Sequence, residues 1–319
     1  MSPSPSMRVD VRAAAFGADP GAAVRVRPGM SAEDRWLVAV ALGGQGRYAA
    51  AAAVLDDLLS APGVPPAVAA HAAVTLAAHR RQLGGHGAAR YWDSVGLRLA
   101  DAAPAGPPDA DGTDALAARV DALVGLAADA IGTGAAGTAQ RLLDAAAEAG
   151  RGHPAWRPAA RLGWVRAELA LLRGDAAAAV APAGAAVELA TAGGSVRHVV
   201  KSRIVHAVAT AVAGGDPGEA LVALDAAADE ADRAGLLSLV WPARYAAADV
   251  IEQAPNGVWT ANDSAVRTAQ RSANGRPSDA PRRRHAGTAT VSVILGRCDP
   301  VGRRLMREGM GLSALLPVT

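Results

Sequence analysis

Alanine-rich, helix-forming segments run along most of the chain, and short glycine-rich breaks interrupt them. The clearest break lies within Ala211–Ala227, where the run AVAGGDPGEALVALDAA stops at two glycines and resumes at once. Gly214 and Gly215 suit the left-handed backbone that ends a helix. Asp216 and Pro217 suit the N-cap and the first position of the next helix. The pattern therefore predicts a helical hairpin at this point.

Similar glycine turns recur at intervals of 38, 50, 40 and 41 residues, at Gly46, Gly84, Gly134, Gly174 and Gly215. The long interval contains the proline-rich segment Asp101–Thr113, which we interpret as a loop between hairpins, so the underlying period is near 40. Five residues after the glycines stand Ala51, Ala89, Ala139, Ala179 and Ala220. Seven residues before them stand Ala39, Ala77, Ala127, Ala167 and Val208. These two columns of small residues are expected where the helices of a pair cross.

This arrangement of a glycine turn between two small residues resembles the tetratricopeptide-repeat family over Ser31–Gly235. The chain is a divergent example, because the tryptophan and tyrosine columns of that family are missing and the period exceeds the usual 34 residues. The resemblance implies an all-α fold, a right-handed superhelix of about five to six antiparallel hairpins with an irregular C-terminal tail. A sixth pair is expected to begin at Leu236 and to take its second helix from Asn262–Asn274.

The domain boundaries follow from this assignment. Residues 1–30 are expected to be an irregular N-terminal segment, 31–256 a tetratricopeptide-like repeat domain, and 257–319 an Arg-rich, partly disordered tail. Within the tail, Asn274–Thr288 is typical of a disordered basic linker. The apolar run Val291–Leu295 then adds a strand or packs on the last hairpin, and a short helix follows it.

Composition changes the picture of the core. Apolar residues make up 51% of the chain, but much of this is alanine, and aromatic residues make up only 3%. The core must therefore rely on close approach of helices rather than on large side chains. The net charge of +2 is uneven, because the segment 257–319 carries 10 Arg and 4 acidic residues and leaves the rest mildly acidic.

Motifs for catalysis and cofactor binding are mostly missing. GTGAAG at Gly132–Gly137 formally matches a dinucleotide fingerprint, but the preceding segment is helical, so we interpret it as a hairpin turn. The only lysine, Lys201, does not follow a glycine-rich loop, and Cys298 is the only cysteine. No two histidines stand four residues apart as in zinc-binding helices. We therefore expect no enzyme activity, no cofactor and no metal.

The N-terminus lacks the apolar core of a signal peptide, and charges interrupt every alanine-rich run before it reaches membrane-spanning length. The expectation is a soluble, cytoplasmic protein without membrane contact.

The groove of the array is the expected binding site. By resemblance to the tetratricopeptide family, groove-facing residues lie 13, 10, 6, 3 and 2 positions before each glycine. From these positions we select the candidates Trp36, His71, Arg81, Asp121, Arg161, Trp164 and Glu168, and in the fifth hairpin the same count points to Ser202 and Val205. Tryptophan and arginine are effective interface anchors. The sequence thus predicts a scaffold or adaptor that binds a protein or peptide, provided that the two indoles are not buried between the helices of their own hairpins.

Three alternatives stay open. The tryptophans could simply fill gaps in an alanine core. The tail, with Arg282, Arg283 and Arg284, could contact nucleic acid or an acidic partner, which would indicate a transcriptional or signalling regulator. The third alternative is an enzyme with its site in a helical cavity, and it needs a convergent cluster of ionisable groups. The oligomeric state is left open.

Overall fold

A computed structural model describes residues 10–253 and 279–309 of the chain. Within these ranges the protein consists of fourteen helices and no strand, which confirms the all-α class. The helices are α1 (Val11–Phe16), α2 (Ala32–Gly44), α3 (Tyr48–Ser60), α4 (Pro66–Gln82), α5 (His86–Ala102), α6 (Ala115–Gly132), α7 (Ala136–Ala149), α8 (Trp156–Leu172), α9 (Ala176–Ala192), α10 (Val196–Val212), α11 (Pro217–Arg233), α12 (Leu237–Gln253), α14 (Asp279–Gly296) and α15 (Pro300–Gly309).

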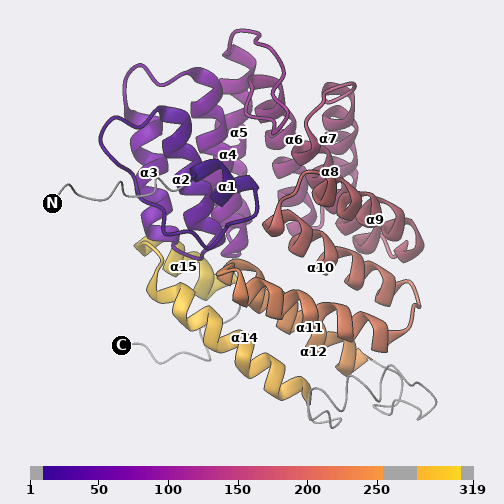
Figure 1. Ribbon diagram of the computed structural model, residues 1–319. Helices are drawn as coiled ribbons and strands as arrows, with labels where there is room; N and C mark the ends of the chain where they lie inside the picture. Colours follow the sequence, from indigo (N-terminus) through magenta and orange to yellow (C-terminus); the bar gives the residue numbers. More distant parts are fainter. Residues whose placement is uncertain (1–9, 254–278, 310–319) are drawn as a thin grey trace, which may run out of the picture.

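Six helices form an inner layer that closes on itself. Each of α2, α4, α6, α8, α10 and α12 packs against the next, and α12 returns to pack against α2. The other long helices pack on the outside, and Figure 1 shows the chain turning through the pairs until its C-terminal helices lie beside its first ones. At the closure, Ser238 Oγ donates a hydrogen bond of 2.9 Å to the carbonyl of Gly44. The first and last pairs are therefore direct neighbours.

Four of the five predicted corner glycines end an inner helix with positive φ, and the fifth corner lies at Gly214 instead of Gly215. At each corner the residue after the glycine donates its N–H to a carbonyl five residues earlier, as Arg47 does to Leu42 and Gly215 to Thr210, both at 2.9 Å. The φ values are 71°, 84°, 74°, 76° and 88° at Gly46, Gly84, Gly134, Gly174 and Gly214. The left-handed backbone is readily adopted only by glycine, which explains the spacing.

The doubled glycine lengthens the fifth turn by one residue, so that α11 begins three residues after its corner where the earlier outer helices begin two residues after theirs. In the first-helix column the buried residue is therefore Ala207, and Val208 is only half-buried. The second-helix column keeps the buried Ala220. The remaining eight alanines of the two columns are fully buried, so the core does rest on close helix approach.

The N-terminal segment is not wholly irregular, as residues 1–30 were expected to be. Asp10 accepts the N–H groups of Arg12 and Ala13 and caps α1, which packs on α2 and α10. Phe16 ends this helix, and its ring lies 5.7 Å from that of Trp36. The segment thus joins the first and fifth pairs at the closure of the ring.

The C-terminal segment is helical where a linker was expected, and of the two alternatives for its apolar run the structure shows packing on the last pair and not a strand. Helix α14 begins at Asp279 and packs along α12, so it serves as the outer helix of the sixth pair, while the predicted Asn262–Asn274 lies outside the described residues. The expected apolar run is part of α14, because Val291 and Ile294 are buried one helical turn apart. Ion pairs join the part expected to be a linker to α11 and α12.

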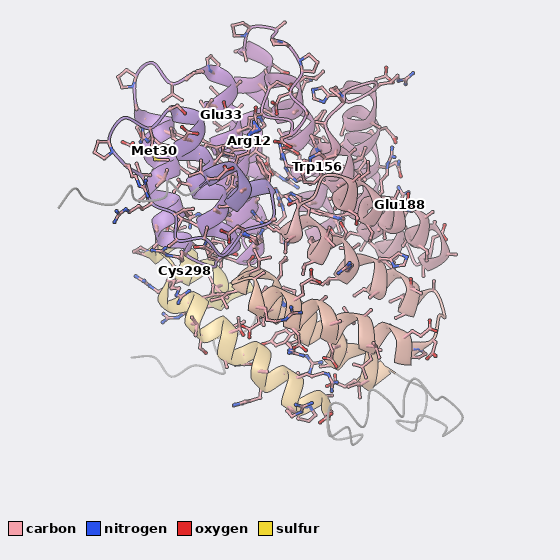
Figure 2. All side chains as sticks on the ribbon, in the orientation of Figure 1. Arg12, Met30, Glu33, Trp156, Glu188 and Cys298 are labelled. Atoms are coloured by element: carbon pink, nitrogen blue, oxygen red, sulfur yellow. The ribbon has the colours of Figure 1, made fainter. Side chains whose placement is uncertain are left out.

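Helix α15 and the preceding turn attach the C-terminal end to the first two pairs. Cys298, labelled in Figure 2, is buried with Tyr48 and Leu83 in one apolar cluster. The carboxylate of Asp299 accepts two hydrogen bonds from Arg80, at 2.8 and 2.6 Å. The ring is therefore fastened by side chains more than two hundred residues apart.

No helix within residues 10–253 and 279–309 is both long enough and apolar enough to cross a lipid bilayer.

Candidate binding cavity

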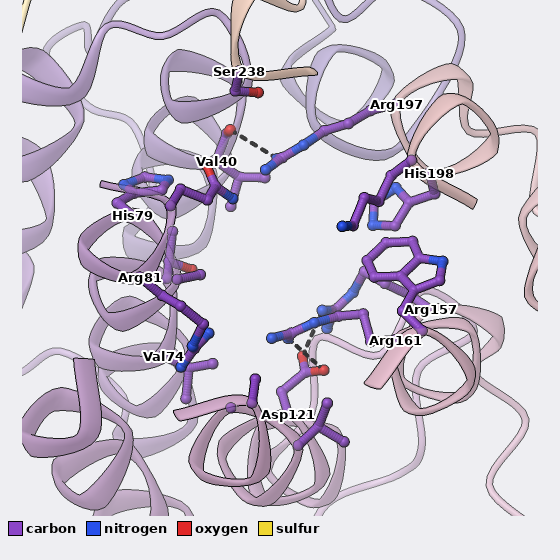
Figure 3. A pocket seen from close by; sticks show the side chains of 18 of the residues that line it. Val40, Val74, His79, Arg81, Asp121, Arg157, Arg161, Arg197, His198 and Ser238 are labelled. Atoms are coloured by element: carbon purple, nitrogen blue, oxygen red, sulfur yellow. Dashed lines mark hydrogen bonds and ion pairs between the residues drawn. The ribbon is translucent and has the colours of Figure 1, made fainter. Parts of the chain in front are cut away.

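The inner helices enclose a central cavity of about 390 Å³, which every inner helix and Phe16 of α1 help to line. Figure 3 shows side chains from opposite walls pointing into this space. The volume lies at the lower end of the range usual for ligand sites. All seven predicted groove residues line the cavity: Trp36, His71, Arg81, Asp121, Arg161, Trp164 and Glu168.

Trp36 occupies a seam between two inner helices. Its indole stacks on His71 of α4 with ring centroids 4.5 Å apart, and its Nε1 donates a 2.8 Å hydrogen bond to Thr75 Oγ1 of the same helix. The side chain is therefore not enclosed within its own hairpin, although only 2% of the residue is exposed.

Trp164 repeats this arrangement on another wall of the ring. Its indole stacks on His198 of α10 at 5.7 Å and donates a 2.8 Å hydrogen bond to Ser202 Oγ. Both tryptophans thus join one inner helix to the next, and both also line the cavity. The two indoles are therefore not buried between the helices of their own hairpins, which was the condition for the groove assignment. A role of these indoles in ligand contact stays a prediction.

Arg81 belongs to a buried charge cluster behind one wall. It forms ion pairs with Asp93 and Asp129, the latter with 2.7 Å between Nε and Oδ1. Burial raises the pKa of Asp93 to about 7, against the opposing effect of Arg81 and with the help of the nearby Asp129. Gly125 makes room for this cluster, because a Cβ atom there would overlap the carboxylate of Asp93.

Asp121 holds two arginines on the next wall. Its carboxylate pairs with Arg157 at 2.5 Å and with Arg161 at 2.6 Å. Arg157 also donates to the carbonyls of Asp111 and Gly112, which anchors it to the loop before α6. Burial by itself would raise the pKa of Asp121, but the two guanidinium groups outweigh it and hold the pKa below its usual range. The carboxylate is therefore ionised.

Arg197 of α10 has no such partner. Its Nη1 donates a 3.1 Å hydrogen bond to the carbonyl of Val40, and no carboxylate of the described residues lies within ion-pair distance. Burial lowers the pKa of Arg197, and the positive charges of Arg161 and Arg157 act in the same direction. Burial also lowers the pKa of His198 well below its usual value, and the charges of Arg197, Arg157 and Arg161 add to this effect. Three arginine side chains are therefore close enough to this wall to disfavour further positive charge there.

The remaining cavity histidines are neutral. Burial lowers the pKa of His71 to about 4 and that of His79 to about 3. The Nδ1 atom of His79 is buried without a hydrogen-bond partner. These rings therefore act at neutral pH as hydrogen-bonding and stacking groups and not as charges.

Two cavity arginines were missed by the repeat spacing. Arg157 and Arg197 each lie 17 residues before their corner glycine, one helical turn beyond the outermost position considered. In α10 the predicted positions were also displaced by one residue, because Gly214 and not Gly215 ends the helix. Counting from Gly214 selects Lys201 and Ile204, and both line the cavity. The sequence offered no signal for this choice, because either glycine of the pair can adopt the positive φ that ends the helix.

The three tail arginines lie far from the cavity, in the first turns of α14. Arg283 pairs with Asp225 of α11 at 2.5 Å, and Arg284 pairs with Asp249 and Glu252 of α12 at 2.6 Å each. Arg282 pairs with Asp279 of its own helix at 3.1 Å. Arg283 and Arg284 thus attach α14 to its neighbours.

Comparisons with protein-family models, with curated proteins and with solved structures find no match for the chain. Among the described residues, no group of three or more His, Cys, Asp or Glu side chains is arranged to hold a metal ion. The central cavity is therefore interpreted from its own geometry.

Proposed function

We propose that the protein is a non-catalytic scaffold or adaptor of the cytoplasm, which takes a short peptide or a segment of a partner protein into the central cavity. One observation carries this proposal: the seven candidate residues chosen from the repeat positions line one cavity. A cavity of about 390 Å³ holds only a short stretch of chain. The aromatic and arginine side chains in its wall are of the kinds that anchor partners in interfaces.

We further infer that the hairpins form a right-handed superhelical array related to tetratricopeptide repeats, with its two ends brought together. The recurring corner glycines and the buried alanine columns support this assignment. In such an array the first helix of each pair lines the concave face. The inner helices of the ring correspond to these first helices, and for this reason the cavity is the expected binding face.

Binding is favoured over catalysis by the state of the ionisable groups in the cavity wall. Asp121 is held ionised by two arginines. The low pKa values of His71 and His79 make both rings weak bases at neutral pH. A general acid or base works best with a pKa near the operating pH, whereas the pKa values of Asp121, His71 and His79 are all lowered away from it.

The regulator alternative requires basic side chains that are available to a partner. Arg283 and Arg284 are each paired with carboxylates of neighbouring helices. No observation in the described part of the tail favours contact with nucleic acid, so we do not propose it as a second function.

The test is a defined array of tri- to pentapeptides, probed with the wild-type chain and with Ala78→Trp. Ala78 lines the cavity from α4, so the added indole occupies the binding space. The matched control is Ala145→Trp on the outer face of α7, where the alanine is exposed. We expect peptides that bind the wild type and Ala145→Trp but not Ala78→Trp. Equal binding to Ala78→Trp, or no bound peptide at all, would contradict the proposal.

A further inference from the structure

The charges that face the central cavity do not balance. Five cationic side chains line it, and four of them, Arg81, Arg157, Arg161 and Lys201, already lie in ion pairs with carboxylates. The fifth, Arg197, is half-buried, and its only hydrogen bond among the described residues goes to a backbone carbonyl. Charges shielded from water are normally paired, so a cation left without a carboxylate in a cavity wall indicates a site for an anion.

Arg197 has a second cation beside it. Lys201 stands four residues later on α10, which places both side chains on one face of the helix, and both line the cavity. The ion pair of Lys201 with Glu168 is long, at 3.6 Å, and about a third of each side chain is exposed. A pair of this kind is weak, so the ammonium group is available to an incoming anion.

We propose that Arg197 and Lys201 bind an anionic group, a carboxylate or a phosphate, carried by the ligand of the central cavity. The inference rests on the proposed binding function and specifies the chemistry of the ligand. A guanidinium group matches either anion, because it can donate two parallel hydrogen bonds to two oxygens. The three arginines that lower the pKa of the nearby His198 agree with this assignment.

The surroundings of the two cations define the rest of the ligand. Ile204, one turn further along α10, and Leu239 of α12 line the cavity, as does the indole of Trp164. An inorganic ion alone would leave these apolar surfaces uncovered. The ligand is therefore expected to carry its anionic group next to an apolar or aromatic body.

The test uses two compounds that differ only in charge, N-acetyltryptophan and N-acetyltryptophanamide. Dissociation constants are measured by calorimetry or ligand-observed NMR for the wild type, Arg197→Gln, Arg197→Lys and the control Arg98→Gln, which changes an exposed arginine on α5. Phenyl phosphate and inorganic phosphate are titrated in parallel. Comparing N-acetyltryptophan with phenyl phosphate shows whether a carboxylate or a phosphate is the preferred anion. Comparing phenyl phosphate with inorganic phosphate shows whether the anion must be part of a larger ligand.

In the wild type we expect the carboxylate to bind at least about tenfold more tightly than the amide, since a charge-assisted hydrogen bond contributes that much. Arg197→Gln should bring this ratio close to one, Arg197→Lys should retain part of it, and Arg98→Gln should leave it unchanged. Thermal unfolding without ligand should be nearly the same in Arg197→Gln as in the wild type. A merely structural role would instead lower stability and leave the ratio as it is.

Three outcomes would overturn the anion site: equal binding of the two compounds, a ratio that persists in Arg197→Gln, or no binding of either compound or of phenyl phosphate. If inorganic phosphate binds as tightly as N-acetyltryptophan, the expectation that the ligand carries an apolar or aromatic body is wrong. The proposed function can hold even if the anion site is absent. Uncharged peptides that bind the wild type but not Ala78→Trp would support the binding function without any anion site.

Discussion

Asp299→Asn tests whether the C-terminal helices hold the ring closed. The carboxylate of Asp299 accepts two hydrogen bonds from Arg80, whose side chain is only 8% exposed, and a third from the N–H of Gly302 at the start of α15. Asparagine is as good a helix cap as aspartate, so the substitution removes mainly the charge. The Asp299 side chain is 21% exposed, which lets solvent replace part of the lost interaction. We therefore expect a loss of about 2–3 kcal/mol in the free energy of unfolding.

Urea unfolding at pH 7 measures this loss, and hydrogen exchange locates it. Amides of α14 and α15 should exchange faster in Asp299→Asn, whereas those of α6 and α7 should keep their protection. The double variant with Arg80→Met is the control, because it removes the cation that would otherwise be left unpaired. In that background the further change at Asp299 should cost much less.

The pH dependence of the effect has a defined sign. Arg80 and the N–H of Gly302 outweigh burial and lower the pKa of Asp299 in the folded protein. The stabilisation is therefore present above the ordinary pKa of 3.8 and is lost as the pH falls through the folded value. A loss below about 0.5 kcal/mol in the free energy of unfolding at pH 7 would refute the reasoning, since surface substitutions alone produce effects of that size. Unchanged hydrogen exchange in α14 and α15 would refute it as well.

Other substitutions test the cavity wall. Gly125→Ala should destabilise the protein by about 1–3 kcal/mol in urea unfolding, because its Cβ would overlap the carboxylate of Asp93; an unchanged midpoint would show that this wall is not closely packed. Trp164→Phe should cost about 1 kcal/mol by removing the hydrogen bond to Ser202, and a Ser202→Ala background should abolish the difference. The pKa of Asp93 is raised from 3.8 to about 7, so its ionisation should make stability fall as the pH rises through that interval. Asp93→Asn should flatten this slope, and a slope that persists would assign the effect to another group.

The inner helices and their corners could be predicted because their determinants are local. A glycine with positive φ followed by a restart of the helix is specified by a few adjacent residues, and this located four corners correctly. At Gly214 and Gly215 either glycine satisfies the local rule, and the choice depends on the packing of α10 against its neighbours. The error of one residue rotates a helix by about 100°, which is why Ser202 and Val205 were predicted in place of Lys201 and Ile204.

The helical character of α14 depended on distant partners. Its first turns contain Arg282–Arg284 and read as a basic linker in isolation, yet carboxylates of α11 and α12 pair with them. The apolar side chains of the same helix are covered by residues of the first pairs, such as Tyr48. None of these contacts lies within the span of a sequence pattern, so the segment could not be assigned from its own residues.

By itself, the sequence determined that the chain is a series of helix pairs with an alanine core, and it selected the face of the inner helices that meets the cavity. Small residues and glycine corners act over one or two helical turns, and patterns of this length can be recognised directly in the sequence. Only the tertiary structure decided that the first and last pairs meet, that the selected face lines a central cavity, and that Arg197 is left without a carboxylate among the residues that the structure describes. Charge balance within a cavity is a sum over side chains from every wall, and those walls are brought together only by folding.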